Sequence, residues 1–495
     1  MGIVIKQSFS NLITTYLGFA IGALNTLFLY INFMSEDYYG LVSFIVSTAM
    51  ILMPVTAFGV HNTLVKFYSA YKGREQSVFL NWMLILPLLV AIPGALICFF
   101  FYEKIGLFLA TKNEIVYDYV WYIFIIAVSS AYFEAFFAWS KVQFKTIFGN
   151  FMKEVFHRLG ITTLLTLLAF DSITVDTFLK ALVGVYVLRM FVMNVYAFML
   201  KRPKHIRYTI TSLTTNRRRP ENFMAILKYT SLIIIAGSVA NLLLDLDKVM
   251  LGLYKEIENV AYYSVAIYIA TVIAVPARAM HQITYPMVAK MLNNKRYDDM
   301  RKLYHKSSLT LFVIASLLFL LIVCNIASLY DMVTVNYRTG LYVVLCIGAA
   351  KLLDNCLGIN NAILYNSDYY RIILVLGVLL IIVAVILNTV FIPIYGINGA
   401  AIATFVASVL YTLFKIIIVY KKFGMQPFTK GSFKTFVLLI LFFSAFYFWD
   451  FTFHPFVNIA LKSILLGGSY LLAIYFLNVS QDVTQAIDGV LKRRK

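Results

Sequence analysis

Charged residues are scarce in this chain of 495 residues. Asp, Glu, Lys and Arg make up 13% of the sequence and hydrophobic residues 61%, whereas soluble domains contain roughly 25% charged residues. The mean hydropathy is +0.82. A water-soluble fold of this length could not cover its surface with so few charges. The composition therefore excludes a soluble globular protein and predicts a chain that lies almost entirely in a lipid bilayer.

Cysteine is equally rare. The four cysteines show no spacing typical of a metal site, and all of them lie in apolar stretches. We interpret Cys98, Cys324, Cys346 and Cys356 as small packing residues.

Motifs for catalysis and energy conversion are also absent. The sequence contains no Gly-rich phosphate loop of the Walker type, no HExxH or GxSxG motif and no Cys/His cluster. The predicted outer loops, of which residues 102–118 form the longest, leave no room for a catalytic domain. Basic residues are not interleaved with aromatic residues in a stripe. We therefore expect no ATP hydrolysis, no enzyme activity and no nucleic-acid partner.

What the chain does contain is a series of apolar stretches. A helix needs roughly 20 apolar residues to cross a bilayer, and a backbone in hydrocarbon must form helices or closed barrels. These stretches are too long for barrel strands, so we predict an all-α polytopic membrane protein with about 14 transmembrane helices. The spans are expected near residues 10–33, 40–65, 78–101, 119–139, 155–170, 177–200, 226–251, 261–285, 306–329, 341–364, 372–392, 397–420, 434–449 and 459–477.

The basic residues are unevenly distributed between the loops. The chain has 42 Lys and Arg against 23 Asp and Glu, a formal charge of +19, and most of the basic residues fall in loops on the side of the termini. Because short cytoplasmic loops are rich in Lys and Arg, both termini are expected in the cytoplasm and the number of spans is expected to be even.

The second half of the chain repeats the first. A shift of 222 residues places Glu36 on Glu258, Pro54 on Pro276 and the turn at residues 171–176 on residues 393–398. Six spans are an even number, so the two copies have the same orientation and a pseudo-two-fold axis along the membrane normal. The predicted organisation is a six-helix lobe (1–200), a basic cytoplasmic connector (201–221), a second six-helix lobe (222–422), two additional helices (423–478) and a basic tail (479–495).

A duplicated membrane protein of this kind is typical of a transporter that alternates access between its lobes. Ionisable residues inside spans are costly, at about 2.5–3.5 kcal/mol each, and tend to mark substrate or ion sites. Two cations lie on one face of the eighth span, and others lie in the tenth and sixth spans. We expect this cationic set to bind an anionic group such as a phosphate: Arg278, His281, Lys351 and Arg189.

Acidic residues in spans are candidates for coupling transport to a proton or sodium ion, and no other cofactor is expected. They are Glu134, Asp354, Asp245 and Asp247. Glu134 is an isolated carboxylate, which either exchanges a proton or, like Asp245, stays protonated and bonds a neighbouring helix. Lys351 and Asp354 either serve transport or only pair with each other, and Asp247 either serves transport or lies at the outer interface.

Three short segments resemble polysaccharide flippases of the multidrug/oligosaccharidyl-lipid/polysaccharide exporter superfamily. They are Phe33–Gly40 (FMSEDYYG), Leu244–Gly252 (LDLDKVMLG) with Ala261–Tyr263, and Pro393–Ala401 (PIYGINGAA). The arginines that lipid II flippases carry in their first two spans are missing, since no Lys or Arg lies between Lys6 and Lys66. The first span also lacks the acidic residue common in multidrug exporters.

The resemblance implies a V-shaped pair of lobes around a central cavity. It implies translocation of undecaprenyl-pyrophosphate-linked oligosaccharide across a bacterial inner membrane, for O-antigen, capsule or another surface polysaccharide, with the two additional helices handling the lipid tail. Lipid-linked oligosaccharide and membrane lipid are then the molecular partners, and a polysaccharide polymerase and a chain-length regulator are the candidate protein partners. The alternatives are a multidrug or small-molecule exporter and a non-transporting scaffold for glycan assembly.

Overall fold

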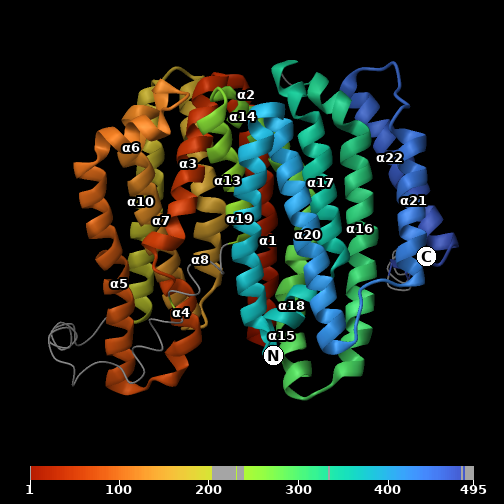
Figure 1. Cartoon of the computed structure of the whole chain (residues 1–495), viewed down its shortest axis with the longest axis horizontal. Helices are drawn as coiled ribbons and strands as arrows, with labels where there is room; N and C mark the ends of the chain where they lie inside the picture. Colours follow the sequence, from red (N-terminus) through yellow and green to blue (C-terminus); the bar gives the residue numbers. More distant parts are fainter. Residues whose placement is uncertain (1, 203–229, 231–238, 333–334, 481–482, 485–495) are drawn as a thin grey trace. The chain divides into compact units, whose positions relative to one another are not determined.

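The structure is a computed structural model that describes residues 2–202, 230, 239–332, 335–480 and 483–484. Every regular element in these ranges is a helix (Figure 1). A chain with this share of apolar residues must satisfy its backbone hydrogen bonds within each segment, and a helix does so. Most of the predicted basic connector and basic tail lie outside the described residues.

Among the residues that the structure describes, eleven stretches are long and apolar enough to cross a membrane. They are Ser10–Phe33, Glu36–Thr56, Glu75–Phe100, Glu114–Lys141, Val175–Leu200, Glu258–His281, Tyr297–Asp331, Asn336–Cys356, Tyr370–Tyr395, Ile397–Phe423 and Pro455–Phe476.

Three further predicted spans are shorter or partly undescribed. The fifth is an unbroken run of α8 (Ile147–Phe151), the π-helix η4 (Met152–Phe156) and α9 (His157–Ala169). The seventh is represented by α13 (Val239–Tyr254), since most of residues 226–238 lie outside the described part. The thirteenth is α21 (Lys430–Phe446). Together with the eleven longer stretches, they agree with the prediction of about 14 helices.

The helices form two compact units. The first comprises Met1–Ala261 with Gly377–Ile381, and the second Tyr262–Leu376 with Ile382–Lys495. This division lies beyond the predicted connector because α13 packs on α3 (Glu36–Thr56) in the first unit. The boundaries of the duplicated lobes therefore stay a prediction.

In the first unit, α7 (Val120–Lys141) is the central helix. It packs against α3, α4 (Val60–Phe67), α5 (Gly73–Phe100) and α10 (Val175–Leu200). The π-helix η4 lies against α1 (Gly2–Leu24), where the helices approach so closely that a Cβ atom on Gly18 would lie 2.3 Å from the Glu154 carbonyl oxygen. Glycine is therefore required at that contact.

In the second unit, α16 (Tyr297–Asp331) packs on α17 (Leu341–Cys356) and also carries the two additional helices, α21 and α22 (Pro455–Phe476). The helix α17 packs in turn on α20 (Ile397–Phe423). Three more helices complete the unit: α15 (Val275–Asn293), α18 (Asn360–Asn366) and most of α19 (Tyr370–Tyr395).

Two spans of the second unit are interrupted. Between α17 and α18 the chain turns at Gly358, whose φ of +52° favours glycine. The other break is a short 3₁₀ segment, η6 (Val272–Ala274), which separates α14 (Glu258–Thr271) from α15 just before Pro276. The two breaks are joined, since the Asn355 side-chain amide donates a hydrogen bond to the Ile273 carbonyl at 3.2 Å. Interrupted helices are a common place for binding sites in transporters.

Candidate functional site

A charged cluster lies inside the first unit, between α7, η4 and α10. Lys153 Nζ lies 2.6 Å from Glu134 Oε1. The Lys153 side chain is 41% exposed, whereas that of Glu134 is 13% exposed. The Lys153 charge is thus partly accessible, on a helical turn that lies just before the predicted fifth span.

Arg189 of α10 belongs to the same cluster. It is buried, at 7% exposure, and its Nη2 donates to Ser130 Oγ at 3.3 Å. Its guanidinium lies 4.3 Å from the Phe133 ring centre and 4.9 Å from that of Tyr186. Its charge also acts on Glu134. Within the described ranges its Nε, which is enclosed, has no hydrogen-bond acceptor.

The cluster has more positive than negative charge. Besides Arg189 and Lys153 it includes Arg158, whose Nη1 lies 3.7 Å from Glu154 Oε2. Lys141 also acts electrostatically on Glu134. Four basic side chains therefore accompany the two carboxylates of Glu134 and Glu154. Such an excess inside a membrane protein is costly unless an anion or water compensates it.

The prediction that Glu134 is isolated is wrong, because Lys153 is its direct partner. Sequence reasoning missed Lys153 since it precedes the weakly apolar fifth span and was assigned to a loop. The π-helical turn at η4 also could not be read from hydropathy. A basic residue one turn before an apolar run was the available signal.

A second polar site lies in the second unit, at the interrupted helices. Lys415 Nζ of α20 lies 3.1 Å from Asp354 Oδ1 and 3.3 Å from Asn361 Oδ1. It also lies 4.5 Å from the centre of the Tyr411 ring. The Lys415 side chain is 2% exposed, whereas that of Asp354 is 48% exposed. The lysine is thus enclosed, and the carboxylate faces accessible space.

Two predicted cations accompany this pair. The charges of His281 and Lys351 both act on Asp354. The alternative in which Lys351 and Asp354 only lock their own helix is incomplete, because the hydrogen-bonded partner of Asp354 comes from another helix. Arg278 is exposed, and no hydrogen bond or ion pair joins it to the residues that the structure describes.

The remaining acidic candidates lie on α13. Ser47 Oγ of α3 donates to Asp245 Oδ1 at 3.1 Å, and Lys248 Nζ lies 4.0 Å from the same oxygen. Asp247 is fully buried. The Ser47–Asp245 hydrogen bond joins α13 to α3. No group of His, Cys, Asp and Glu suited to a metal ion occurs in the described ranges.

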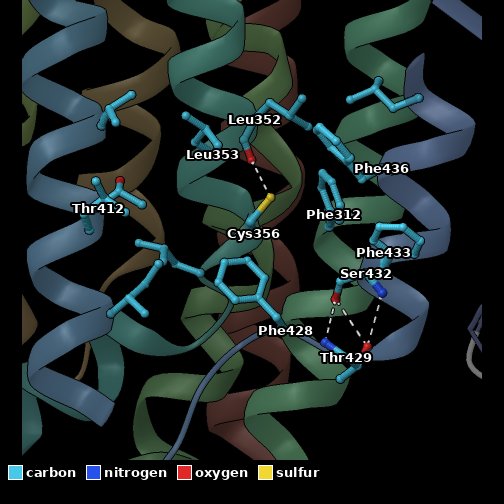
Figure 2. A pocket seen from close by; sticks show the side chains of 15 residues that line it. Phe312, Leu352, Leu353, Cys356, Thr412, Phe428, Thr429, Ser432, Phe433 and Phe436 are labelled. Atoms are coloured by element: carbon cyan, nitrogen blue, oxygen red, sulfur yellow. Dashed lines mark hydrogen bonds between the residues drawn. The ribbon is translucent and has the colours of Figure 1, made fainter. Parts of the chain in front are cut away.

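An apolar groove of about 420 Å³ lies between α16, α17, α20 and α21 (Figure 2). Figure 2 shows Phe312, Leu352 and Phe436 around it, with Phe428 and Thr429 at one end. Thr429 and Ser432 cap α21 there through reciprocal hydrogen bonds. The additional helix α21 thus supplies one wall of a cavity that suits a hydrocarbon chain.

A comparison with known protein families identifies the family to which the chain belongs. The family model described as "Polysaccharide biosynthesis protein" matches residues 4–292, more than half of the sequence. The chain belongs to this polysaccharide biosynthesis protein family. No curated protein matches the sequence.

Solved structures similar to this family member are membrane transporters. The lipid II flippase MurJ in an inward closed conformation has a TM-score of 0.68 at 14% identity, covering 96% of this chain and 98% of that chain. The Vibrio cholerae MATE transporter VcmN in its bent form has a TM-score of 0.53 at 14% identity, and the match covers 86% of this chain and 98% of that chain. An inward-facing multidrug resistance MATE family transporter of the MOP superfamily has a TM-score of 0.55 at 13% identity, and the match covers 86% of this chain and 95% of that chain.

At 13–14% sequence identity, the similarity to these solved structures establishes the fold. The predicted all-α, multi-pass membrane protein with about 14 helices is confirmed, as is the resemblance to polysaccharide flippases. The family and these folds are those of membrane transporters and flippases and not of enzymes, as the sequence predicted.

Proposed function

We propose that this member of the polysaccharide biosynthesis family is a flippase for undecaprenyl-pyrophosphate-linked oligosaccharide. The observation that carries the proposal is the cationic cluster of the first unit, with Arg189 and Lys153 at its centre. A pyrophosphate would compensate the excess positive charge, and a planar guanidinium can donate two parallel hydrogen bonds to it.

The apolar groove supports the same substrate class. A polyprenyl chain has no polar atoms, so it needs a wall like that formed by Phe312, Leu352 and Phe436. In a bilayer such a groove would otherwise hold lipid tails, which a polyprenyl chain can replace at little cost because both are apolar.

The two ion pairs offer a means of coupling. Protonation of Glu134 or Asp354 would weaken the attraction to Lys153 or Lys415 and change the charge that the substrate meets. We propose that a proton taken up by one of these carboxylates, or a sodium ion bound by it, drives transport. We further propose that the protein acts in a bacterial inner membrane with both termini in the cytoplasm, as the basic loops indicate.

The decisive experiment is the sidedness of labelled undecaprenyl-linked oligosaccharide in cells with and without the protein. The probe is an outer-face reagent that cannot cross the inner membrane. Loss of the outer pool together with accumulation of the inner pool is the expected result. An unchanged outer pool would refute the proposal and favour export of another solute or a scaffold role.

A further inference from the structure

A second cavity, polar rather than apolar, lies at one end of the second unit. It has a volume of about 550 Å³ and lies between the ends of α15, α18 and α20 and the starts of α16 and α19. Its walls include Asn293, Tyr297, Asn366, Asp368, Tyr369 and Lys422. Lys295, Arg296 and Lys421 adjoin it in sequence, so the positive-inside rule places this end on the cytoplasmic side.

The polar groups of this cleft are available to a ligand. Asn293 and Asp368 make no hydrogen bond with any part of the chain that the structure describes, and both are exposed. Asn366 uses its amide nitrogen to bond the Ala362 carbonyl at 2.8 Å, which leaves its side-chain oxygen as an acceptor. The cleft thus offers an amide, a carboxylate and a further amide oxygen, all able to bond hydroxyl groups.

One aromatic ring forms an open platform beside these groups. Tyr297 is 45% exposed, and its ring lies against Phe423 at 6.4 Å between centres. Tyr369 differs, because the Lys422 amine lies 4.9 Å from its ring centre. One face of the Tyr297 ring is therefore open to a ligand. The Tyr369 ring instead contacts the Lys422 amine, which is the only amine among the lining side chains.

This combination points to a sugar and not to an anion or an apolar chain. A pyranose has hydroxyl groups around its rim and C–H groups on its faces, which pack on the negative face of an aromatic ring. A phosphate would meet the Asp368 carboxylate as well as the Lys422 amine, which lies on the Tyr369 ring. A hydrocarbon would leave the amides without partners. We propose that the cleft binds a pyranose ring of the lipid-linked oligosaccharide, which rests on the proposed function.

The position of the cleft along α20 fits such a ligand. Ile416 lines the apolar groove and Phe423 lines the cleft. Residues seven apart in a helix lie on one face and about 10.5 Å apart along its axis. A molecule with its polyprenyl chain in the groove would therefore leave its sugars near the cleft.

The experiment uses the full chain in lipid nanodiscs. The probe is the lipid-linked oligosaccharide that accumulates in cells without the protein, together with the free glycan that mild acid releases from it. We expect Tyr297→Ala and Asp368→Asn to weaken binding of the free glycan at least tenfold. Tyr297→Phe keeps the ring and should bind within twofold of the unaltered protein.

Two exposed neighbours outside the cleft serve as matched controls. Tyr420→Ala and Asp298→Asn remove the same side chains at the same end of the unit and should leave glycan binding unchanged. Unchanged binding in Tyr297→Ala and Asp368→Asn would overturn the sugar site while the flippase proposal stands. Displacement of the glycan by phosphatidylglycerol in the nanodisc would reassign the cleft to a lipid headgroup. Absence of any accumulated lipid-linked oligosaccharide would overturn both proposals.

Discussion

Replacing Asp354 by Asn is expected to destabilise the second unit more than replacing its partner Lys415 by Met. In Asp354→Asn the lysine stays charged in an enclosed site with 2% of its side chain exposed. In Lys415→Met the carboxylate that remains is 48% exposed and can be hydrated. The unequal burial of the two partners therefore predicts unequal costs.

The magnitudes follow from burial. Breaking a buried ion pair on one side costs about 3–5 kcal/mol. Because Asn361 and the Tyr411 ring still contact the lysine, we expect about 3 kcal/mol for Asp354→Asn, the low end of that range. Removing the partner of a hydrated carboxylate costs only about 1 kcal/mol of folding free energy. For a unit of this size 1 kcal/mol corresponds to about 2–4 °C.

The assay is the apparent melting temperature of the purified chain in one detergent, measured by loss of the monodisperse peak after heating. Asp354→Asn should melt about 6–12 °C below the unaltered protein, and Lys415→Met about 2–4 °C below it. The double variant removes both charges and should melt close to Lys415→Met. A larger loss for Lys415→Met than for Asp354→Asn would refute the reasoning.

Four other changes test the remaining features. Arg189→Lys, which loses the planar fork, should lower flipping about tenfold or more in the sidedness assay. Glu134→Gln should keep substrate binding but lose acceleration by a pH gradient in proteoliposomes. Thr412→Trp should fill the groove and reduce undecaprenyl-pyrophosphate retention, whereas Leu410→Trp, outside the groove, should not. Gly358→Ala should lower the free energy of unfolding by more than about 1 kcal/mol, measured by denaturant unfolding, since its Cβ would lie 2.6 Å from Ser308 N.

Hydropathy predicted the helices well because lipid imposes one rule on every span. The elements that deviate from that rule were harder to read. The helical run of the fifth span begins at Ile147, before the predicted residue 155, and contains the π-helical turn η4. The break at Gly358 depends on a positive φ angle at this residue. Many other glycines in the sequence do not adopt such an angle, so a glycine alone does not predict a break. Pro276, which cannot donate a backbone hydrogen bond, lies two residues after the break at η6.

The candidate site was predicted in part. His281, Lys351 and Asp354 were selected as charges in spans, and they come together. Lys153 and Lys415 were missed, although each forms the central ion pair of its unit. Ion pairs between helices join residues 19 and 61 positions apart, and no local periodicity encodes such pairs. The polar cleft was also missed, because it is formed by the ends of five helices.

The π-helical turn at η4 sets the phase of the helix that follows. A π turn holds one residue more than an α turn, so it is equivalent to a single-residue insertion. Deleting one residue from Met152–Phe156 would restore regular α-helix and rotate α9 by about 100° relative to α8. Arg158 would then leave its place beside Asn25, whose side chain bonds the Arg158 carbonyl at 2.9 Å. The positions of the charged side chains that follow η4 in the first unit thus depend on this one additional residue.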